Sequence, residues 1–329
     1  MTTALLIGGT RFIGRHTVSE LLAHGYDVTL FTRGNRPNPF ADDDRVDHVE
    51  GDRTNDSALE AAASTVDPDV VIDTVAYKPR EVETATRIFS DVDAYVYVSS
   101  GAAYADEEIP KREGMTRLHE CSDEQAVDDD WDTYGNRKAE GDRACFRAAD
   151  RGVNAMVVRP PVVYGPHDYT DRFDYWLQRV DEHDRVVVPG DGTNVWHRVF
   201  VADVAKALRV VAEEGTPGEA YNVGDGDAVT LERMVRLVAG ALDTDVEVVH
   251  AGERELGVAD LTHEDFPLYR SYPHLLAIEK LRDLGWEPTP VDAAISQTAE
   301  AYRERDRTDL DRGPSREAEE RVLEVLGTI

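Results

Sequence analysis

Long apolar runs, cysteines and metal-binding patterns are scarce in this sequence. No apolar stretch approaches the roughly 18 residues of a membrane-spanning helix, and residues 1–7 lack the features of a signal peptide. Two cysteines, Cys121 and Cys145, are too few for a disulfide framework, and we expect both to be packing residues. The histidines show no H-E-x-x-H spacing, and G-x-S-x-G is absent. We therefore expect a soluble, cytoplasmic protein with no metal site and no such hydrolase nucleophile.

Basic residues are also few. Lys and Arg number 36 against 66 Asp and Glu, which gives a net charge of −30, and only 5 of the cations are lysines. A surface this acidic keeps a protein dispersed by self-repulsion and needs counter-ions. We interpret it as adaptation to a high-salt cytoplasm, as in a halophilic archaeon, with an ordinary acidic bacterial enzyme as the alternative. The same charge argues against nucleic-acid binding, which uses basic patches.

Apolar runs alternate with amphipathic segments along the first half of the chain. Strands are expected near 4–7, 28–31, 70–72, 94–98 and 154–158, with helices after Gly14 and near 81–90 and 133–151. This alternation predicts an α/β fold, a doubly wound parallel sheet of the Rossmann type. We assign it to residues 1–160, with return segments from about 195–225.

The texture of the sequence changes after Arg159. Prolines and glycines crowd residues 160–166, and short strands near 186–188 and 246–249 alternate with helices near 203–214 and 230–242. We expect a smaller α/β substrate lobe over residues 161–305. Residues 306–329 are expected to form a charged connector and a terminal helix capped by Ser315.

A glycine-rich turn follows the first predicted strand. Gly8, Gly9 and Gly14 lie between this strand and the following helix, where glycines allow the backbone to approach a pyrophosphate beside the helix N-terminus. A turn that binds nothing is the alternative. We expect a dinucleotide to contact a set of residues here: Gly8, Thr10, Arg11, Phe12, Ile13 and Gly14.

The residues after the second strand bear on which dinucleotide fits. An acid there would accept a hydrogen bond from a ribose 2′-OH, but Arg33 and Arg36 occur instead. Guanidinium groups can pair with a 2′-phosphate, so we expect NADP to be preferred over NAD. Both arginines could instead be solvated or pair with the acids at 42–44. Asp52, two residues past the strand-like run that follows these acids, is a candidate contact of the adenine or its neighbouring backbone.

Tyr134 and Lys138 are spaced to lie on one face of a helix. A nearby ammonium lowers the pKa of a phenol, so Tyr134 could exchange a proton with a carbinol oxygen. This spacing alone is common, but here it follows a buried strand ending in Ser99 and Ser100. Side chains at the carboxyl end of such a strand line the ligand crevice.

These motifs together resemble the extended short-chain dehydrogenase/reductase superfamily, in its NAD-dependent epimerase/dehydratase group. The resemblance covers about residues 3–305 and rests also on 159–166, 197–203, 221–224 and 284–288. It implies a catalytic triad of Ser100, Tyr134 and Lys138, the last two also binding cofactor. It further implies cofactor contacts at Arg53, Val75, Ala76, Pro160 and Val162, and substrate contacts at Tyr104 and Arg198.

The chain departs from that family's pattern at three places. Arg11 replaces the middle glycine of the turn, which is similar to atypical members such as the chloroplast stem-loop-binding proteins. The stretch 76–99 is too short for the family's dimer-forming helix, so a monomer or a homodimer is expected. Gly101 and Ala102 stand where dehydratases carry Asp-Glu. The resemblance implies an NAD(P)-dependent epimerase or oxidoreductase acting on a nucleotide sugar; the alternative is a non-catalytic, RNA-binding or cofactor-sensing protein.

Overall fold

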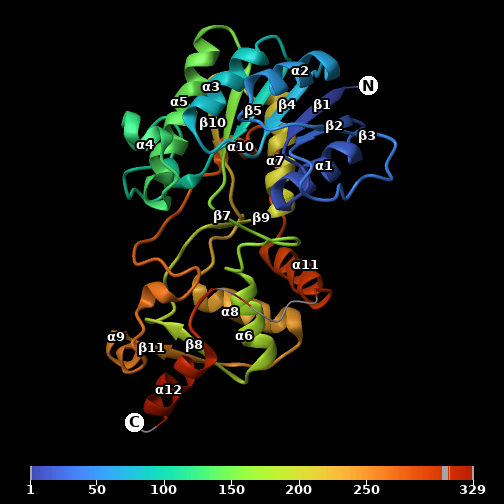
Figure 1. The fold of residues 1–329 in the computed structure, drawn as a ribbon. Coiled ribbons are helices and arrows are strands. Elements are labelled where there is room, and N and C mark those ends of the chain that lie inside the picture. Colours follow the sequence, from blue (N-terminus) through green and yellow to red (C-terminus); the bar gives the residue numbers. More distant parts are fainter. Residues whose placement is uncertain (1, 306–309, 311, 328–329) are drawn as a thin grey trace. The chain divides into compact units, whose positions relative to one another are not determined.

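The computed structural model describes residues 2–305, 310 and 312–327, which form two compact units (Figure 1). The first unit comprises Met1–Val163, Val201–Gly224 and Leu276–Pro288, and the second comprises Tyr164–Phe200, Asp225–Leu275 and Thr289–Ile329. The sequence led us to expect a return segment at about 195–225. The second return segment contains one short helix, α10 (Glu279–Arg282), which is too short to produce a periodic pattern.

A seven-stranded parallel sheet forms the middle of the first unit. Its strands are β1 (Thr3–Ile7), β2 (Asp27–Thr32), β3 (Val46–Glu50), β4 (Val70–Asp73), β5 (Ala94–Val98), β6 (Ala155–Arg159) and β10 (Ala220–Asn222). The strand order is β10-β6-β5-β4-β1-β2-β3, and every pair is parallel. The chain order reverses direction between β1 and β4. In such sheets ligands bind at this reversal, beyond the carboxyl ends of the strands.

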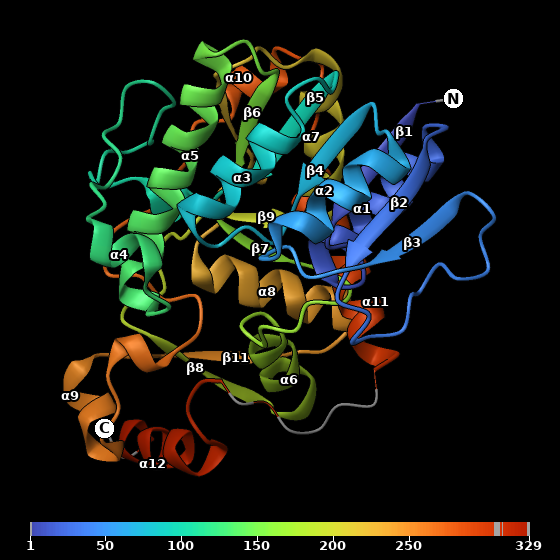
Figure 2. The same cartoon turned by 45° about the horizontal axis from the view of Figure 1, so that its top comes forward.

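Helices cover both faces of this sheet (Figure 2). One face carries α1 (Phe12–Ala23) beside α7 (Val201–Glu214), and the other carries α2 (Asp56–Val66), α3 (Pro79–Ile88) and α5 (Tyr134–Asp150). Because both faces are covered, the central strands are buried along their whole length and read as continuous apolar runs. The doubly wound Rossmann architecture expected from the sequence is thus confirmed. Short elements complete the unit: η1 (Gly101–Ala103), α4 (Asp123–Val127) and η2 (Trp131–Thr133).

The second unit is smaller and mixes short strands with helices. It contains α6 (Asp174–Glu182), β8 (Arg185–Pro189), β9 (Arg198–Phe200), α8 (Leu231–Leu242), β11 (Glu247–Ala251), α9 (Glu253–Leu256), η3 (Gly257–Ala259), η4 (His263–Asp265), α11 (Val291–Arg303) and α12 (Arg316–Leu326), while β7 (Val162–Tyr164) leads into it along the chain. β8 and β11 pair in parallel. As expected, Ser315 caps α12 by accepting a hydrogen bond from the amide of Ala318. Residues 306–309 and 311 of the expected connector lie outside the described residues. No helix in the described ranges has the length and apolar character needed to cross a bilayer.

Candidate active site

The glycine turn after β1 lies at the reversal of the strand order. Gly8 and Gly9 adopt φ of +116° and +109°, which side-chain-bearing residues rarely adopt. A Cβ at Gly14 would lie 2.6 Å from the amide nitrogen of Gly9, so α1 begins directly against the turn. Across the reversal, the hydroxyl of Thr74 after β4 donates to the carbonyl of Ile7 at 3.0 Å. The turn is therefore a tight backbone cradle that a larger residue at position 14 would fill.

The N-terminus of α1 fits the pyrophosphate of a dinucleotide. Its first turn carries no acidic side chain, so nothing there offsets the positive end of the helix dipole. Arg11, at the N-cap, is exposed, Phe12 is buried, and Thr10 and Ile13 are half-buried. These four residues, which are predicted to contact the cofactor, follow Gly9 along the chain into the first turn of α1.

Charged side chains gather where β2 and β3 end. Arg33 and Arg36 are both exposed. Asp52 accepts hydrogen bonds from the amide and hydroxyl of Thr54, and these lower the pKa of its carboxyl. Glu50 was not predicted, and parallel pairing brings it level with the end of β2. Its carboxylate carbon lies 2.7 Å from where a Cβ of Gly34 would be, so an acid lies against the residue that follows Arg33.

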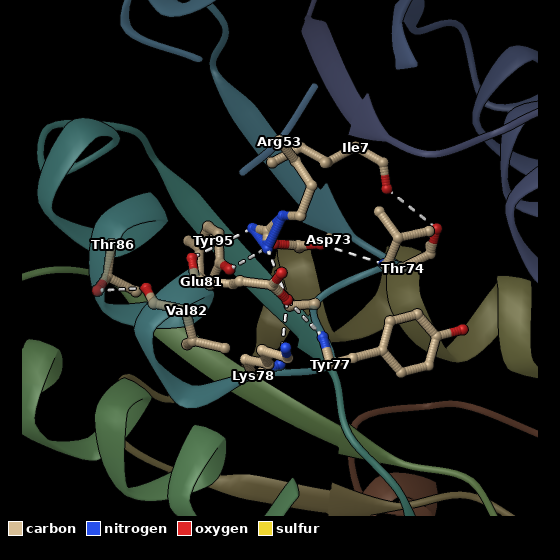
Figure 3. A network of polar contacts seen from close by, with 12 residues as sticks. Ile7, Arg53, Asp73, Thr74, Tyr77, Lys78, Glu81, Val82, Thr86 and Tyr95 are labelled. Carbon is tan, nitrogen blue, oxygen red and sulfur yellow. Dashed lines mark hydrogen bonds and ion pairs between the residues drawn. The ribbon is translucent and has the colours of Figure 1, made fainter. Parts of the chain in front are cut away.

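Arg53, a predicted cofactor contact, has its side chain in an ion pair inside the unit. Its side chain is only 9% exposed and turns into the unit, where its Nη2 atom donates to Oδ2 of Asp73 at 2.6 Å (Figure 3). Asp73 ends β4 with no exposed surface and also accepts from the hydroxyl of Tyr95 at 3.1 Å. A buried carboxylate needs a cation, and this requirement explains the inward turn of the guanidinium. A charged residue closing an otherwise apolar strand was the sequence signal for this pair.

Lys138 is buried at the carboxyl ends of β4 and β5. Its Nζ atom donates to the carbonyl oxygens of Ala76, at 2.7 Å, and Val98, at 2.9 Å. It also lies 4.8 Å from the centre of the Tyr97 ring. Burial lowers the pKa of the ammonium to about 8, while the charges of Asp73 and Asp142 oppose that shift. The group thus lies where Val75 and Ala76 were predicted to meet the cofactor.

Tyr134 and Ser100 lie in two segments that pack against each other in space, the start of α5 and the N-cap of η1. Tyr134 begins α5, and a Cβ on the next residue, Gly135, would overlap the carbonyl oxygen of Ala102 in η1. The first turn of α5 therefore lies directly on η1. Ser100 caps η1 by accepting a hydrogen bond from the Ala102 amide at 3.1 Å. The Lys138 Nζ atom lies 5.8 Å from the centre of the Tyr134 ring, so the three members of the expected triad share one region.

A buried ionic cluster ties these turns together. Arg159, at the end of β6, donates from Nε to Asp142 of α5 and from Nη1 to the hydroxyl of Tyr104, both at 2.8 Å. The Tyr104 hydroxyl also donates to Asn222 at 2.9 Å, and the side chain is 4% exposed. Tyr104 was predicted to touch the substrate; here it holds the segment after η1. Pro160, a predicted cofactor residue, accepts from the amide of Gly101 at 2.8 Å.

The remaining predicted residues are buried. Val162 is 4% exposed in the first unit. Arg198 belongs to the second unit, where it is 3% exposed and its Nη2 atom donates to the carbonyl of Val229 at 2.7 Å. Burial lowers the pKa of its guanidinium, against the charge of Asp225. Trp131 was not predicted: it is 77% exposed, and its ring centre lies 5.3 Å from that of Tyr134. No short motif marks such a residue.

The fold agrees with comparisons to known proteins. The model of the NAD dependent epimerase/dehydratase family matches residues 4–224. This chain belongs to that family. A chloroplast stem-loop binding protein of 41 kDa from Arabidopsis thaliana is 29% identical over 298 residues, covering 86% of this chain and 74% of that protein.

Two solved structures share the fold. A dTDP-glucose 4,6-dehydratase from Bacillus anthracis, in complex with NAD, is 20% identical with a TM-score of 0.73, covering 93% of this chain and 98% of that one. A UDP-glucose 4-epimerase from Thermotoga maritima, with UDP-glucose, is 21% identical with a TM-score of 0.72, covering 92% and 99%. At these identities the likeness defines the architecture.

The ionic cluster gives a stability prediction. We expect Arg159→Met to destabilise the fold by about 3–5 kcal/mol, because Asp142 would be left buried without its partner. Burial raises the pKa of Asp142, so its protonation should relieve part of this loss as the pH is lowered. Urea unfolding at pH 7.5 and pH 5 measures both effects. Arg147→Met removes exposed ion pairs and should cost less than about 1 kcal/mol. Equal losses in the two variants would contradict the assignment.

Proposed function

We propose that this protein is an NAD(P)-dependent epimerase or oxidoreductase. It moves a hydride to or from a carbinol carbon of a nucleotide-sugar-like substrate, and Tyr134 acts as the acid/base. One observation carries the proposal: a buried ammonium, Lys138, lies one helical turn from Tyr134 on a helix seated against η1. Burying a lysine ammonium costs free energy, and an ammonium beside a phenol is suited to stabilise the phenolate.

The chain's own residues supply the proton chemistry. The nicotinamide ring of a bound dinucleotide would supply the hydride acceptor or donor. The cradle at Gly14, with the N-terminus of α1, would hold the pyrophosphate of that dinucleotide. A nearby ammonium favours the phenolate form of a tyrosine, so Lys138 prepares Tyr134 to take the hydroxyl proton. Ser100 orients the substrate oxygen. Loss of the hydroxyl proton and of a hydride from the carbon leaves a ketone; return of the hydride to the other face of that carbon, and of the proton to its oxygen, inverts the carbon.

A nucleotide sugar is the proposed substrate class because the two compared structures are enzymes of sugar nucleotides. The residues after Ser100 favour epimerisation or reduction over dehydration. Gly101 and Ala102 form η1 and carry no acid, whereas removing water across a carbon–carbon bond needs a positioned general acid and base.

A second candidate, RNA binding without catalysis, is favoured by the likeness to the stem-loop binding protein. The net charge of −30 opposes it, because RNA affinity depends on cations that neutralise phosphates. A mobility-shift titration in molar KCl tests this candidate. Tight RNA binding by a protein with no turnover would establish it over the enzyme.

Removing one oxygen from Tyr134 tests the enzyme. Tyr134→Phe should lower turnover by about 10²–10⁴-fold, because it removes the proton donor and acceptor. Affinity for NAD should change less than about twofold, since the ring remains. Nicotinamide absorbance follows turnover across a panel of UDP- and dTDP-sugars, and calorimetry gives the affinity. Tyr272→Phe, at a tyrosine that is 48% exposed in the second unit, is the control. Full turnover by Tyr134→Phe would refute the assignment.

The charge of Lys138 gives a pH prediction. Burial lowers the pKa of this ammonium to about 8, and only its protonated form supports Tyr134. The kcat/KM for cofactor should therefore be full below pH 8 and fall as the pH rises through that value. Lys138→Arg keeps its charge at all these pH values and should lose the alkaline limb, at lower activity. A limb unchanged in Lys138→Arg would show that another group titrates.

We further propose that NADP is preferred over NAD. Arg33 and Arg36 are exposed at the end of β2 and can pair with a 2′-phosphate, while Glu50 opposes it. Arg33→Gln should weaken NADP about tenfold, the loss of one hydrogen bond between charged groups. Glu50→Gln should strengthen NADP, with NAD changed little by either variant. Dissociation constants from calorimetry decide the matter, and a clear NAD preference in the unaltered protein would end the proposal.

A further inference from the structure

A buried group of three charges lies behind the loop that joins β4 to α3. The group consists of Arg53, Asp73 and Glu81, none more than 13% exposed at the side chain. The guanidinium lies between the two carboxylates (Figure 3): Nη2 is 2.6 Å from Oδ2 of Asp73, and Nη1 is 3.6 Å from Oε2 of Glu81. Nη2 also donates to the backbone carbonyl of Glu81 at 3.2 Å.

The two carboxylates hold opposite ends of one loop, residues 74–78. At its start, Oδ1 of Asp73 accepts from the amide of Val75 at 3.2 Å. At its end, Oε2 of Glu81 accepts from the amides of Tyr77, at 2.7 Å, and Lys78, at 3.0 Å. The guanidinium thus joins the two carboxylates that fix both ends of the loop.

The loop carries the carbonyl that receives Lys138. Ala76 lies in the middle of it, and its oxygen is 2.7 Å from the Lys138 Nζ atom. A shift of this carbonyl would therefore change the position of the ammonium relative to Tyr134. Since small displacements of catalytic groups have large effects on rate, the arrangement of the loop bears directly on the chemistry.

Stability alone does not account for these buried charges. A buried ion pair is often no more stabilising than apolar side chains of the same volume, because desolvation offsets the attraction. Here the charges also make directional hydrogen bonds to the loop, which apolar groups cannot. The planar fork of an arginine can address two carboxylates at once, whereas a lysine offers a single nitrogen.

We propose that Arg53 is a positioning residue: by clasping Asp73 and Glu81 it fixes residues 74–78, and so places the Ala76 carbonyl and Lys138 for the nicotinamide end of the cofactor. This inference rests on the proposed function. It assigns Arg53 no contact with cofactor or substrate, although it follows Asp52 directly in the chain.

Two variants and a control test the clasp. Arg53→Met removes the charge, Arg53→Lys keeps it with one nitrogen, and Arg80→Met removes an exposed arginine of α3 that pairs with Asp56. In the cofactor-free protein, amide hydrogen exchange at 75–78 should be faster in Arg53→Met than in the other two variants.

Calorimetry should show that Arg53→Met binds NAD about tenfold more weakly than the unaltered protein does. This is the loss expected when one hydrogen bond between the cofactor and a charged group, here Lys138, is removed. ADP, which lacks the nicotinamide end, should bind within about twofold of the unaltered protein. The affinity of Arg53→Lys for NAD should fall between those of Arg53→Met and the unaltered protein.

The outcomes separate the alternatives. Equal weakening of ADP and NAD would show that Arg53 acts on the adenine end, and would overturn the clasp. Unchanged exchange at 75–78 in Arg53→Met would also overturn it. If Arg53→Met does not fold, the exchange and the NAD-to-ADP ratio of Arg53→Lys decide. If the unaltered protein binds neither nucleotide, the proposed function fails, while the exchange experiment still tests whether Arg53 fixes the loop.

Discussion

The arrangement of the site depends on one buried ammonium accepted by two backbone carbonyls. Parallel strands end at the same edge of a sheet, so the carbonyls of Ala76 and Val98, after β4 and at the end of β5, converge there. An ammonium placed between them fixes the register of α5 along the sheet. Because Tyr134 lies one turn earlier on the same helix, the bond that satisfies the lysine also sets where the phenol lies.

In this protein, buried arginines join segments of backbone that belong to different strands and helices. Arg159 joins β6 to α5 and to the segment after η1, and Arg53 joins β4 to α3. In both cases an arginine fork uses two separate nitrogens to contact groups from different elements. At position 138 a lysine is needed instead, because a single compact nitrogen must fit between two carbonyls and close to the Tyr134 ring.

Periodicity and glycine positions were enough to predict most of the sheet and its helices and the turn at the reversal of strand order, but not α2 or β10. They depend on local geometry: a strand buried on both faces must be apolar throughout, and Gly8 and Gly9 take positive φ. The inward turn of Arg53 and the burial of Tyr104 could not be read this way. Each is decided by a partner far along the chain, Asp73 for the first and Arg159 with Asn222 for the second. Glu50 was missed because it meets β2 through strand pairing and not through sequence.

The acidic surface and the binding of an anionic cofactor are compatible for a physical reason. A pyrophosphate is compact, and backbone amides at a helix N-terminus can bind it without a basic side chain. An RNA strand spreads its charge over many phosphates and needs cations along its whole length. Of the 36 basic residues, several are already committed to internal carboxylates, as Arg53, Arg159 and Arg179 are. The electrostatics therefore favour a small dianion at the glycine cradle, where the helix dipole acts locally, over a polyanion on the surface.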